Sequence, residues 1–181
     1  MIITITGYPG AGKSTVGRIL AKKLRMKYYY TGDLMRKMAK ERNITLEEMQ
    51  RKAEKDFEYD RKIDAFSLQL ARKHRNFILD ARLGFYFIPD SVKVYLSVDP
   101  EIAAKRIVND KRPEESKSCT KKQAIKKIKE RVSSENKRYK RYYNVVIHDP
   151  RNYDIIIDTT NMTPEEIADS IIKIIKKNKN K

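Results

Sequence analysis

The sequence predicts an α/β fold in which a central parallel sheet carries helices on both faces. Two observations support this prediction. Short β-branched runs alternate with amphipathic segments of crossover length, and a glycine-rich phosphate-binding pattern joins the first run to the first amphipathic segment. A chain of 181 residues can bury a core within one domain. We therefore expect residues 1–181 to form a single domain.

The glycine-rich pattern fits the phosphate-loop consensus, GxxxxGK followed by Ser or Thr, without a mismatch. Residues 1–6 before it are a β-branched run, and apolar residues recur at helical spacing after it. A bound phosphate would thus lie at a helix N-terminus, where backbone N–H groups face it. The Lys13 ammonium can reach the outer phosphates of ATP, and the Ser14 hydroxyl can join the coordination of Mg²⁺. The residues expected to bind the ATP phosphates are Gly7, Tyr8, Pro9, Gly10, Ala11, Gly12, Lys13, Ser14 and Thr15.

The next segments continue the alternation of strand and helix. Residues 28–30 predict a strand, and a helix is expected over about 33–42. Thr45 and Glu48 have the spacing of a capping box and mark the start of another helix. A further helix is expected over about 58–73. Its predicted apolar stripe consists of Ile63, Phe66, Leu70 and Ala71.

The second half of the chain shows the same alternation, although periodicity does not predict the order of the strands. Residues 109–120 are polar and include a proline, which is typical of a mobile lid. The expected strands cover residues 76–80, 92–98 and 153–158. The expected helices cover residues 99–108, residues 121–142 and a segment that begins at Pro164.

The composition is strongly basic, with 41 Lys and Arg against 24 Asp and Glu and a net charge of +17. This balance indicates attraction to polyanions or to phosphorylated small molecules and does not choose between them. For most of the lysines, a solvated helix face or a frayed tail is the simpler explanation.

Cys119 is the only cysteine, so the chain cannot form an internal disulfide. No apolar run reaches membrane length, and the N-terminal residues enter a strand directly. We therefore expect a cytoplasmic protein without a membrane partner.

Arginines distinguish a kinase from other phosphate-loop proteins. Phosphoryl transfer requires mainly positioning of the two substrates and neutralisation of charge on the transferred group, so cations should converge from several segments. Two of them, Arg131 and Arg138, are seven residues apart and share one helix face. The arginines placed near the carboxyl ends of strands or near the lid are Arg36, Arg82, Arg106, Arg112, Arg131 and Arg138.

Taken in order, six segments resemble archaeal-type cytidylate kinases. The likeness extends over nearly the whole chain, and its more specific parts are Asp80-Ala81-Arg82-Leu83 and residues 131–143. The chain departs from many members of that family, which have Thr at the positions of Lys13 and Ser14. The segments are GYPGAGKST, TGDLMR, FILDARLGF, VYLSVDPEIAAKRI, ERVSSENKRYKRYY and YDIIIDTTNMTPEE.

The resemblance implies a nucleoside monophosphate kinase fold, with a monophosphate-binding flap over about residues 31–74 and a short lid over about 109–120. The implied reaction is Mg²⁺-assisted transfer of phosphate from ATP to CMP or dCMP. The partners would be small nucleotides, without obligatory nucleic acid, and the protein is expected to be a monomer. By position, Arg36 and Arg82 would hold the acceptor phosphate. The implied catalytic cations are Lys13, Arg82, Arg106, Arg112, Arg131 and Arg138.

Base recognition can be considered from the residues themselves. Cytosine presents an amino donor with N3 and O2 acceptors, so a carboxylate beside an Arg or an amide can read it. Asp60, Arg61 and Asp64 lie on the predicted flap and offer that combination. The alternative is a charged helix surface, because Asp60 and Asp64 are one turn apart.

Asp80 is expected to contact the substrates and has two possible polar roles. It can hold Mg²⁺ through water, or it can fix Arg82 by an ion pair. A buried carboxylate without a partner would be costly, so one of these roles is favoured. No general base is needed, because the acceptor phosphate is already ionised.

Three rival functions fit parts of the sequence. A kinase of the same fold could act on AMP, UMP or a small metabolite such as shikimate. An ATP-dependent RNA-binding protein would account for the charge of +17 and for the mixture of Lys and Tyr at residues 137–143. A GTPase is less favoured because no guanine-reading segment is evident.

Overall fold

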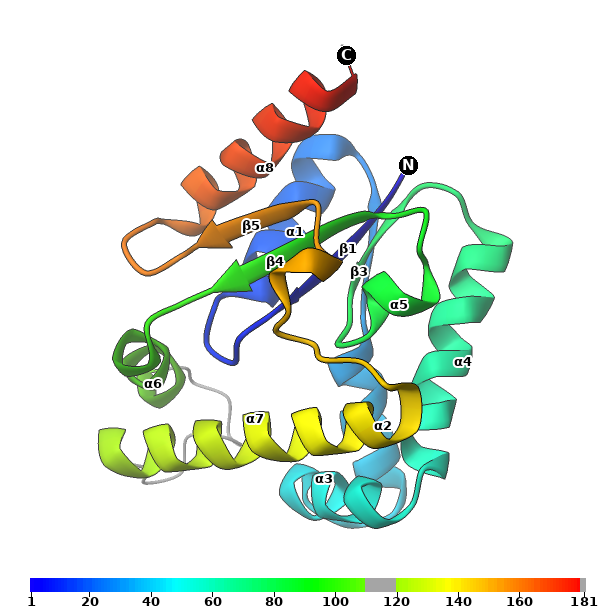
Figure 1. Ribbon diagram of the computed structural model, residues 1–181, viewed down its shortest axis with the longest axis vertical. Helices are drawn as coiled ribbons and strands as arrows, with labels where there is room; N and C mark the ends of the chain where they lie inside the picture. The colour runs from blue at the N-terminus through cyan, green and yellow to red at the C-terminus, as the bar shows by residue number, and fades with distance from the viewer. Residues whose placement is uncertain (110–119, 180–181) are drawn as a thin grey trace.

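The computed structural model of the chain describes residues 1–109 and 120–179. Within them, five parallel strands form one sheet in the order β2-β3-β1-β4-β5 (Figure 1). The predicted parallel sheet is therefore confirmed, and the structure adds the order of its strands. The strands are β1 (Ile2–Gly7), β2 (Lys27–Tyr30), β3 (Phe77–Asp80), β4 (Val92–Ser97) and β5 (Ile155–Asp158).

Strand β1 occupies the centre of the sheet, between β3 and β4. Its Ile5 is in register with Asp80 of β3 and with Val94 of β4. All five strands end at the same edge, where open α/β sheets bind their ligands. The phosphate loop that follows β1 therefore lies in the middle of that edge.

The expected long helices are present, with bounds that agree within a few residues. They are α1 (Lys13–Leu24), α2 (Thr31–Glu41), α3 (Leu46–Lys55), α4 (Glu58–Lys73), α6 (Pro100–Asn109), α7 (Lys121–Tyr143) and α8 (Pro164–Lys179). The capping box predicted from Thr45 and Glu48 is formed at the start of α3. Sequence patterns did not predict α5 (Gly84–Phe87) or the 3₁₀ helix η1 (Pro150–Asn152), because a single turn is too short to show a periodicity.

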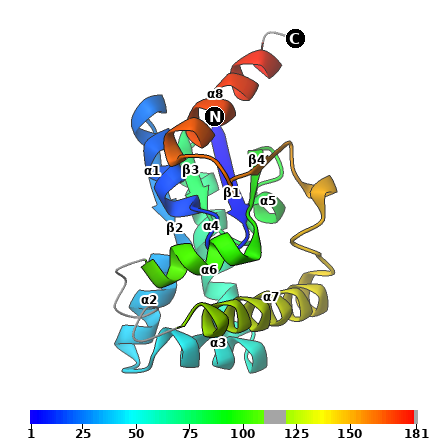
Figure 2. The ribbon, with the colours of Figure 1, turned by 90° about the vertical axis from the view of Figure 1, so that its left-hand side faces the viewer.

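The helices cover the sheet in two layers. Along β3, Ile78 packs in the same cluster as residues of α1 and α8, whereas Phe77 and Leu79 pack in the cluster that contains Leu70 of α4. Successive side chains of a strand point to opposite faces, so α4 lies on the face opposite α1 and α8. Figure 2 shows α5 on the side of the sheet away from α1. The prediction of helices on both faces is confirmed.

The buried face of α4 differs from the predicted apolar stripe. Of the predicted residues, only Leu70 is fully buried. Helix α4 extends beyond the edge of the sheet, so only its C-terminal half packs against the strands (Figure 1). The N-terminal half turns polar side chains inward, toward a cavity and toward α7. The residues buried on α4 are Asp60, Asp64, Ser67 and Leu70.

The predicted lid at residues 109–120 lies outside the described residues, apart from its two end positions, and Arg112 lies outside them as well. In the part of the chain that the structure describes, no helix combines the length and the apolar character needed to cross a bilayer.

Candidate active site

A cavity of about 640 Å³ opens at the carboxyl edge of the sheet. Its walls come from the phosphate loop, from α2 and α4, from the turn after β3, and from α6, α7 and the start of α8. Segments from the whole length of the chain thus converge on one space, which is large enough for small-molecule ligands.

Backbone conformation forms the phosphate loop. Gly10 and Gly12 have φ of +81°, in the left-handed region that favours glycine. A Cβ atom on Gly10 would lie 2.8 Å from the backbone oxygen of Ala103, so the loop also needs glycine for its close approach to α6. The Tyr8 amide donates to the Leu96 carbonyl at 2.9 Å and ties the loop to β4.

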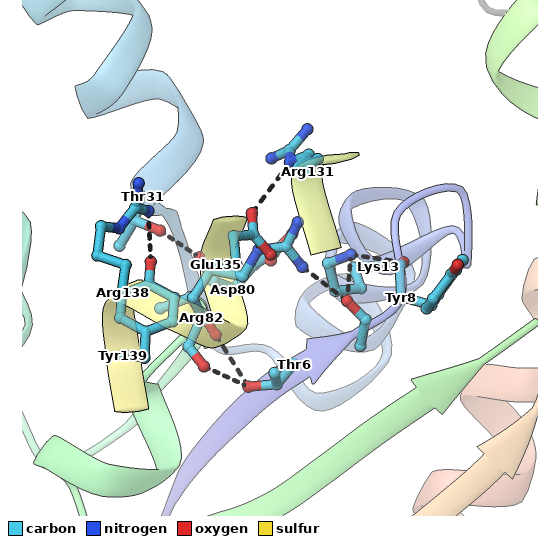
Figure 3. A network of polar contacts seen from close by, with 12 residues as sticks. Thr6, Tyr8, Lys13, Thr31, Asp80, Arg82, Arg131, Glu135, Arg138 and Tyr139 are labelled. Carbon is cyan, nitrogen blue, oxygen red and sulfur yellow. Dashed lines mark hydrogen bonds and ion pairs between the residues drawn. The ribbon is translucent and has the colours of Figure 1, made fainter. Parts of the chain in front are cut away.

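Lys13 lies folded over this loop. Its Nζ donates to the carbonyl oxygens of Gly7 at 3.1 Å and of Tyr8 at 3.0 Å (Figure 3). Burial lowers the pKa of the ammonium to about 7, and the positive charge of Arg82 acts in the same direction. An anion bound in the loop would reverse this effect by favouring the charged lysine.

Asp80 ends β3 beside the first turn of α1. Its Oδ2 accepts hydrogen bonds from the Ser14 hydroxyl at 3.2 Å and from the Tyr28 hydroxyl at 3.1 Å. Burial raises the pKa of this carboxyl, and the charges of Lys13 and Arg82 oppose that rise. Of the two roles left open by the sequence, the structure does not give Asp80 the ion pair with Arg82. Arg82 pairs with a different carboxylate.

That carboxylate is Glu135 on α7. Its Oε1 accepts from Arg82 Nε at 3.1 Å and from Arg131 Nε at 3.0 Å, while the Arg82 NH1 group donates to the Gly7 carbonyl at 2.7 Å (Figure 3). Burial alone would raise the pKa of Glu135, but the two guanidinium groups outweigh it and hold the pKa at about 2. Glu135 therefore binds two arginines from different segments beside the phosphate loop.

A second polar contact joins α7 to α4. The Arg138 guanidinium lies 2.7 Å from Asp60 Oδ2, and both side chains are almost fully buried. Burial raises the pKa of Asp60 to about 6, and the charge of Arg138 opposes this rise. On the next turn of α4, Asp64 accepts a hydrogen bond from the Tyr143 hydroxyl. These buried contacts contradict the alternative of a charged helix surface.

Two further arginines, Arg36 and Arg106, line the cavity. The Arg36 guanidinium lies 5.2 Å from the ring centre of Tyr30 on α2's side of the cavity. Arg106 donates to the carbonyl oxygens of Thr159 at 2.7 Å and of Thr160 at 3.3 Å, which holds α6 against the loop after β5. Beside Arg106, the lining becomes apolar, with Ile107, Met162, Pro164 and Ile167.

The structure brings most of the predicted site residues together. Those that line the cavity are Pro9 to Thr15, Arg36, Asp64, Asp80, Arg82, Arg106, Arg131 and Arg138. Gly7 and Tyr8 stand behind the lining and offer their carbonyl groups to Lys13. Arg61 is not brought into the cavity. Its side chain is 67% exposed and pairs with Glu58, because it lies on the outer face of α4.

The sequence reasoning gave no role to Glu135, Ser67 or Tyr30, which also line the cavity. A signal for Glu135 was available in α7. The inward stripe of α7 begins with apolar side chains and continues with charged ones at the same helical spacing. Charged residues that continue an apolar stripe face inward, whereas those of a solvated surface lie on the opposite face of the helix. The stripe consists of Ala124, Ile128, Arg131, Glu135 and Arg138.

Sequence comparisons find a matching family and similar proteins. Residues 2–161 match the family described as the cytidylate kinase-like family. The chain is 38% identical to the cytidylate kinase of Sulfurisphaera tokodaii, with 93% of this chain and 91% of that protein covered. It is 36% identical to the cytidylate kinase of Sulfolobus acidocaldarius, with 97% and 94% covered.

Among solved structures, a shikimate kinase from Acinetobacter baumannii in complex with shikimate superposes with a TM-score of 0.66 at 20% identity, covering 99% of this chain and 95% of that one. At that identity the likeness concerns the fold. It agrees with the predicted α/β fold, with a parallel sheet between helices.

Proposed function

Because the chain belongs to the cytidylate kinase-like family, we propose that it transfers the γ-phosphoryl group of ATP to CMP or dCMP, with ADP and CDP or dCDP as products. One observation supports this proposal most strongly. A single cavity joins a phosphate loop to a group of arginines and buried carboxylates on α4 and α7, so it offers adjacent places for a donor and an acceptor.

The donor end is formed by the phosphate loop and the surroundings of Arg106. Backbone N–H groups of residues 7–15, apart from Pro9, would face the β- and γ-phosphates. Lys13 would move from the carbonyl groups of Gly7 and Tyr8 to the phosphate oxygens. The apolar lining near Met162 and Pro164 is suited to a nucleotide base, with Arg106 at its edge.

Ser14 and Asp80 fit a magnesium ion. Their side-chain oxygens are 3.2 Å apart beside the phosphate loop, and oxygen ligands are those that Mg²⁺ prefers. Asp80 would act through water, and the Ser14 hydroxyl would ligate directly. When bound, the ion would neutralise charge on the phosphate oxygens.

The acceptor phosphate would bind between Arg36 and Arg82. Arg82 comes from the turn after β3 and is held by Glu135 and the Gly7 carbonyl, so its guanidinium is already positioned beside the phosphate loop. Arg131 shares Glu135 and would add positive charge near the transferred group. This preorganised charge would lower the barrier, because the group in transfer spreads negative charge over its equatorial oxygens.

The acceptor base would lie against α4. Asp64 and Ser67 present oxygen atoms to the cavity, and cytosine offers its exocyclic amino group as a donor. From the sequence, Arg61 was expected to be the arginine that helps to recognise the base. In the structure, Arg138 is the arginine that lies beside Asp60. We therefore assign that role to Arg138.

A coupled assay of ADP release with CMP, dCMP, UMP, AMP and shikimate tests the proposal. We expect turnover with CMP or dCMP and at least about tenfold lower kcat/KM with the other acceptors. Arg82→Ala should lower kcat/KM for the acceptor far more than it weakens ATP binding. Preferred turnover of another acceptor would overturn the proposal, and so would RNA-stimulated ATP hydrolysis without a nucleotide acceptor.

We also propose that the enzyme works in the cytoplasm as a monomer and needs no nucleic acid.

A further inference from the structure

Tyr143, the last residue of α7, contacts a residue that lines the acceptor side of the cavity. Its hydroxyl donates to Oδ2 of Asp64 on α4. Asp64 lines the cavity and Tyr143 does not. Any influence of the Tyr143 hydroxyl on a bound base would therefore pass through the carboxylate of Asp64.

Aromatic packing fixes the ring of Tyr143. Its centre lies 5.5 Å from that of Phe57, 5.6 Å from that of Tyr86 and 5.5 Å from that of Phe87. Aromatic rings at such separations prefer particular relative orientations, so the Tyr143 ring has little freedom to turn. The hydroxyl is thus held at one place, directed at Asp64.

We propose that Tyr143 is a positioning residue that aims Asp64 at the acceptor base and favours its ionised form, and that it thereby raises the preference for cytosine over uracil. This inference rests on the proposed function and extends it. An ionised carboxylate only accepts hydrogen bonds, so it suits the amino group of cytosine and repels the carbonyl oxygen at the same position of uracil. A protonated carboxyl can donate a hydrogen bond and would lose that discrimination.

The charged and titratable groups that face Asp64 are Asp60 on the same helix and Arg138 and Tyr143 from α7. Burial raises the pKa of Asp64 to about 7, and Asp60 adds to the rise. The hydrogen bond from Tyr143 and the charge of Arg138 oppose it. Without the Tyr143 hydroxyl, the pKa of Asp64 should rise further, and the carboxyl would be largely protonated at neutral pH.

The test compares Tyr143→Phe with Tyr142→Phe, which removes a hydroxyl from the neighbouring ring, packed against Phe57 at a tilt of 35°. For Tyr143→Phe we expect the ratio of kcat/KM for CMP to that for UMP to fall by roughly tenfold at pH 7. KM for ATP should stay within about twofold. In wild type the ratio should rise with pH through the pKa of Asp64, and in Tyr143→Phe the rise should occur at higher pH. In Tyr142→Phe the ratio should be unchanged. An equal ratio in the two variants would overturn the inference.

A second measurement does not depend on catalysis. The carboxyl carbon of Asp64, followed by NMR in the ligand-free protein, should titrate at higher pH in Tyr143→Phe than in wild type or Tyr142→Phe. An unchanged midpoint overturns the inference even if CMP is phosphorylated. If wild type phosphorylates no nucleotide, the proposed function fails and the inference on base choice fails with it, whereas a shifted midpoint would still show that Tyr143 controls Asp64.

Discussion

The proposed donor and acceptor ends of the cavity are built in different ways. At the donor end, residues 7–15 are contiguous, two glycines have left-handed backbone, and the flanking elements are anchored by fully buried Ile5 and Val16. At the acceptor end, α4 and α7 meet through the pairs Asp60–Arg138 and Asp64–Tyr143.

The two ends therefore depend on different interactions. A phosphate loop made by backbone conformation keeps its shape when one of its side chains is removed. A site made by buried ion pairs does not, because the removal of one partner leaves the other charge buried and unpaired. Substitutions at the donor end should thus affect mainly catalysis, and those at the acceptor end should affect catalysis and stability together.

The largest expected effect is that of Lys13→Ala. We expect kcat to fall by a factor of about 10²–10³, because a positioned cation beside the transferred phosphate is lost. The free energy of unfolding and KM for CMP should change little, since the backbone of the loop remains. Steady-state kinetics and urea unfolding measure both quantities. Lys22→Ala, at an exposed lysine of the same helix, is the control. A large loss of stability in Lys13→Ala would contradict the contrast between the two ends.

Glu135→Ala should give the next largest effect. It leaves Arg82 and Arg131 without their shared carboxylate, and we expect the free energy of unfolding to fall by about 3 kcal/mol. The matched control is Glu130→Ala, which removes an exposed carboxylate of the same helix that pairs with Lys126 at 3.8 Å. Its effect should be below about 0.5 kcal/mol in urea unfolding. Equal losses in the two variants would count against a structural role for the Glu135 contacts.

Arg36→Ala removes the arginine of the predicted flap that lines the cavity. We expect KM for CMP to rise by roughly thirtyfold, since a charge-assisted contact to the acceptor phosphate is lost. KM for ATP should be nearly unchanged. Arg61→Ala removes an exposed arginine of the flap and should leave both constants within about twofold. If Arg61→Ala raised KM for CMP as much as Arg36→Ala, the placement of Arg61 outside the site would be wrong.

The smallest expected effect is proton uptake when ATP binds. The pKa of Lys13 is about 7 in the free protein, so the lysine is largely neutral at pH 8. Phosphate oxygens favour the charged form and raise its pKa, so ATP binding should take up close to one proton at pH 8 and less at pH 6. The apparent affinity for ATP should accordingly weaken as pH rises above 7. Calorimetry in two buffers of different ionisation enthalpy measures the uptake, which should vanish in Lys13→Ala. Uptake that does not depend on pH would exclude Lys13 as its source.

The contrast between the two ends also explains what could be predicted from the sequence. The parallel sheet and the phosphate loop were predicted because β-branched runs, helical periodicity and glycine spacing are local signals. Asp60–Arg138 was not, because its partners are far apart in sequence and each residue alone resembles a surface charge. The same limit led to the choice of Arg61, which is next to Asp60 in the chain but points away from it in space. The order of the strands could not be predicted from periodicity for the same reason, because it depends on which distant segments lie side by side.

The most direct test of the account is a competition among acceptors. Wild-type protein, MgATP and equal concentrations of CMP, UMP and AMP are mixed, and ³¹P NMR or chromatography follows the nucleoside diphosphates formed. We predict that CDP forms first, with one ADP released for each CDP. First formation of UDP or of a second equivalent of ADP from AMP, or ADP release without phosphorylation of any acceptor, would contradict the claim that the acceptor end selects cytosine.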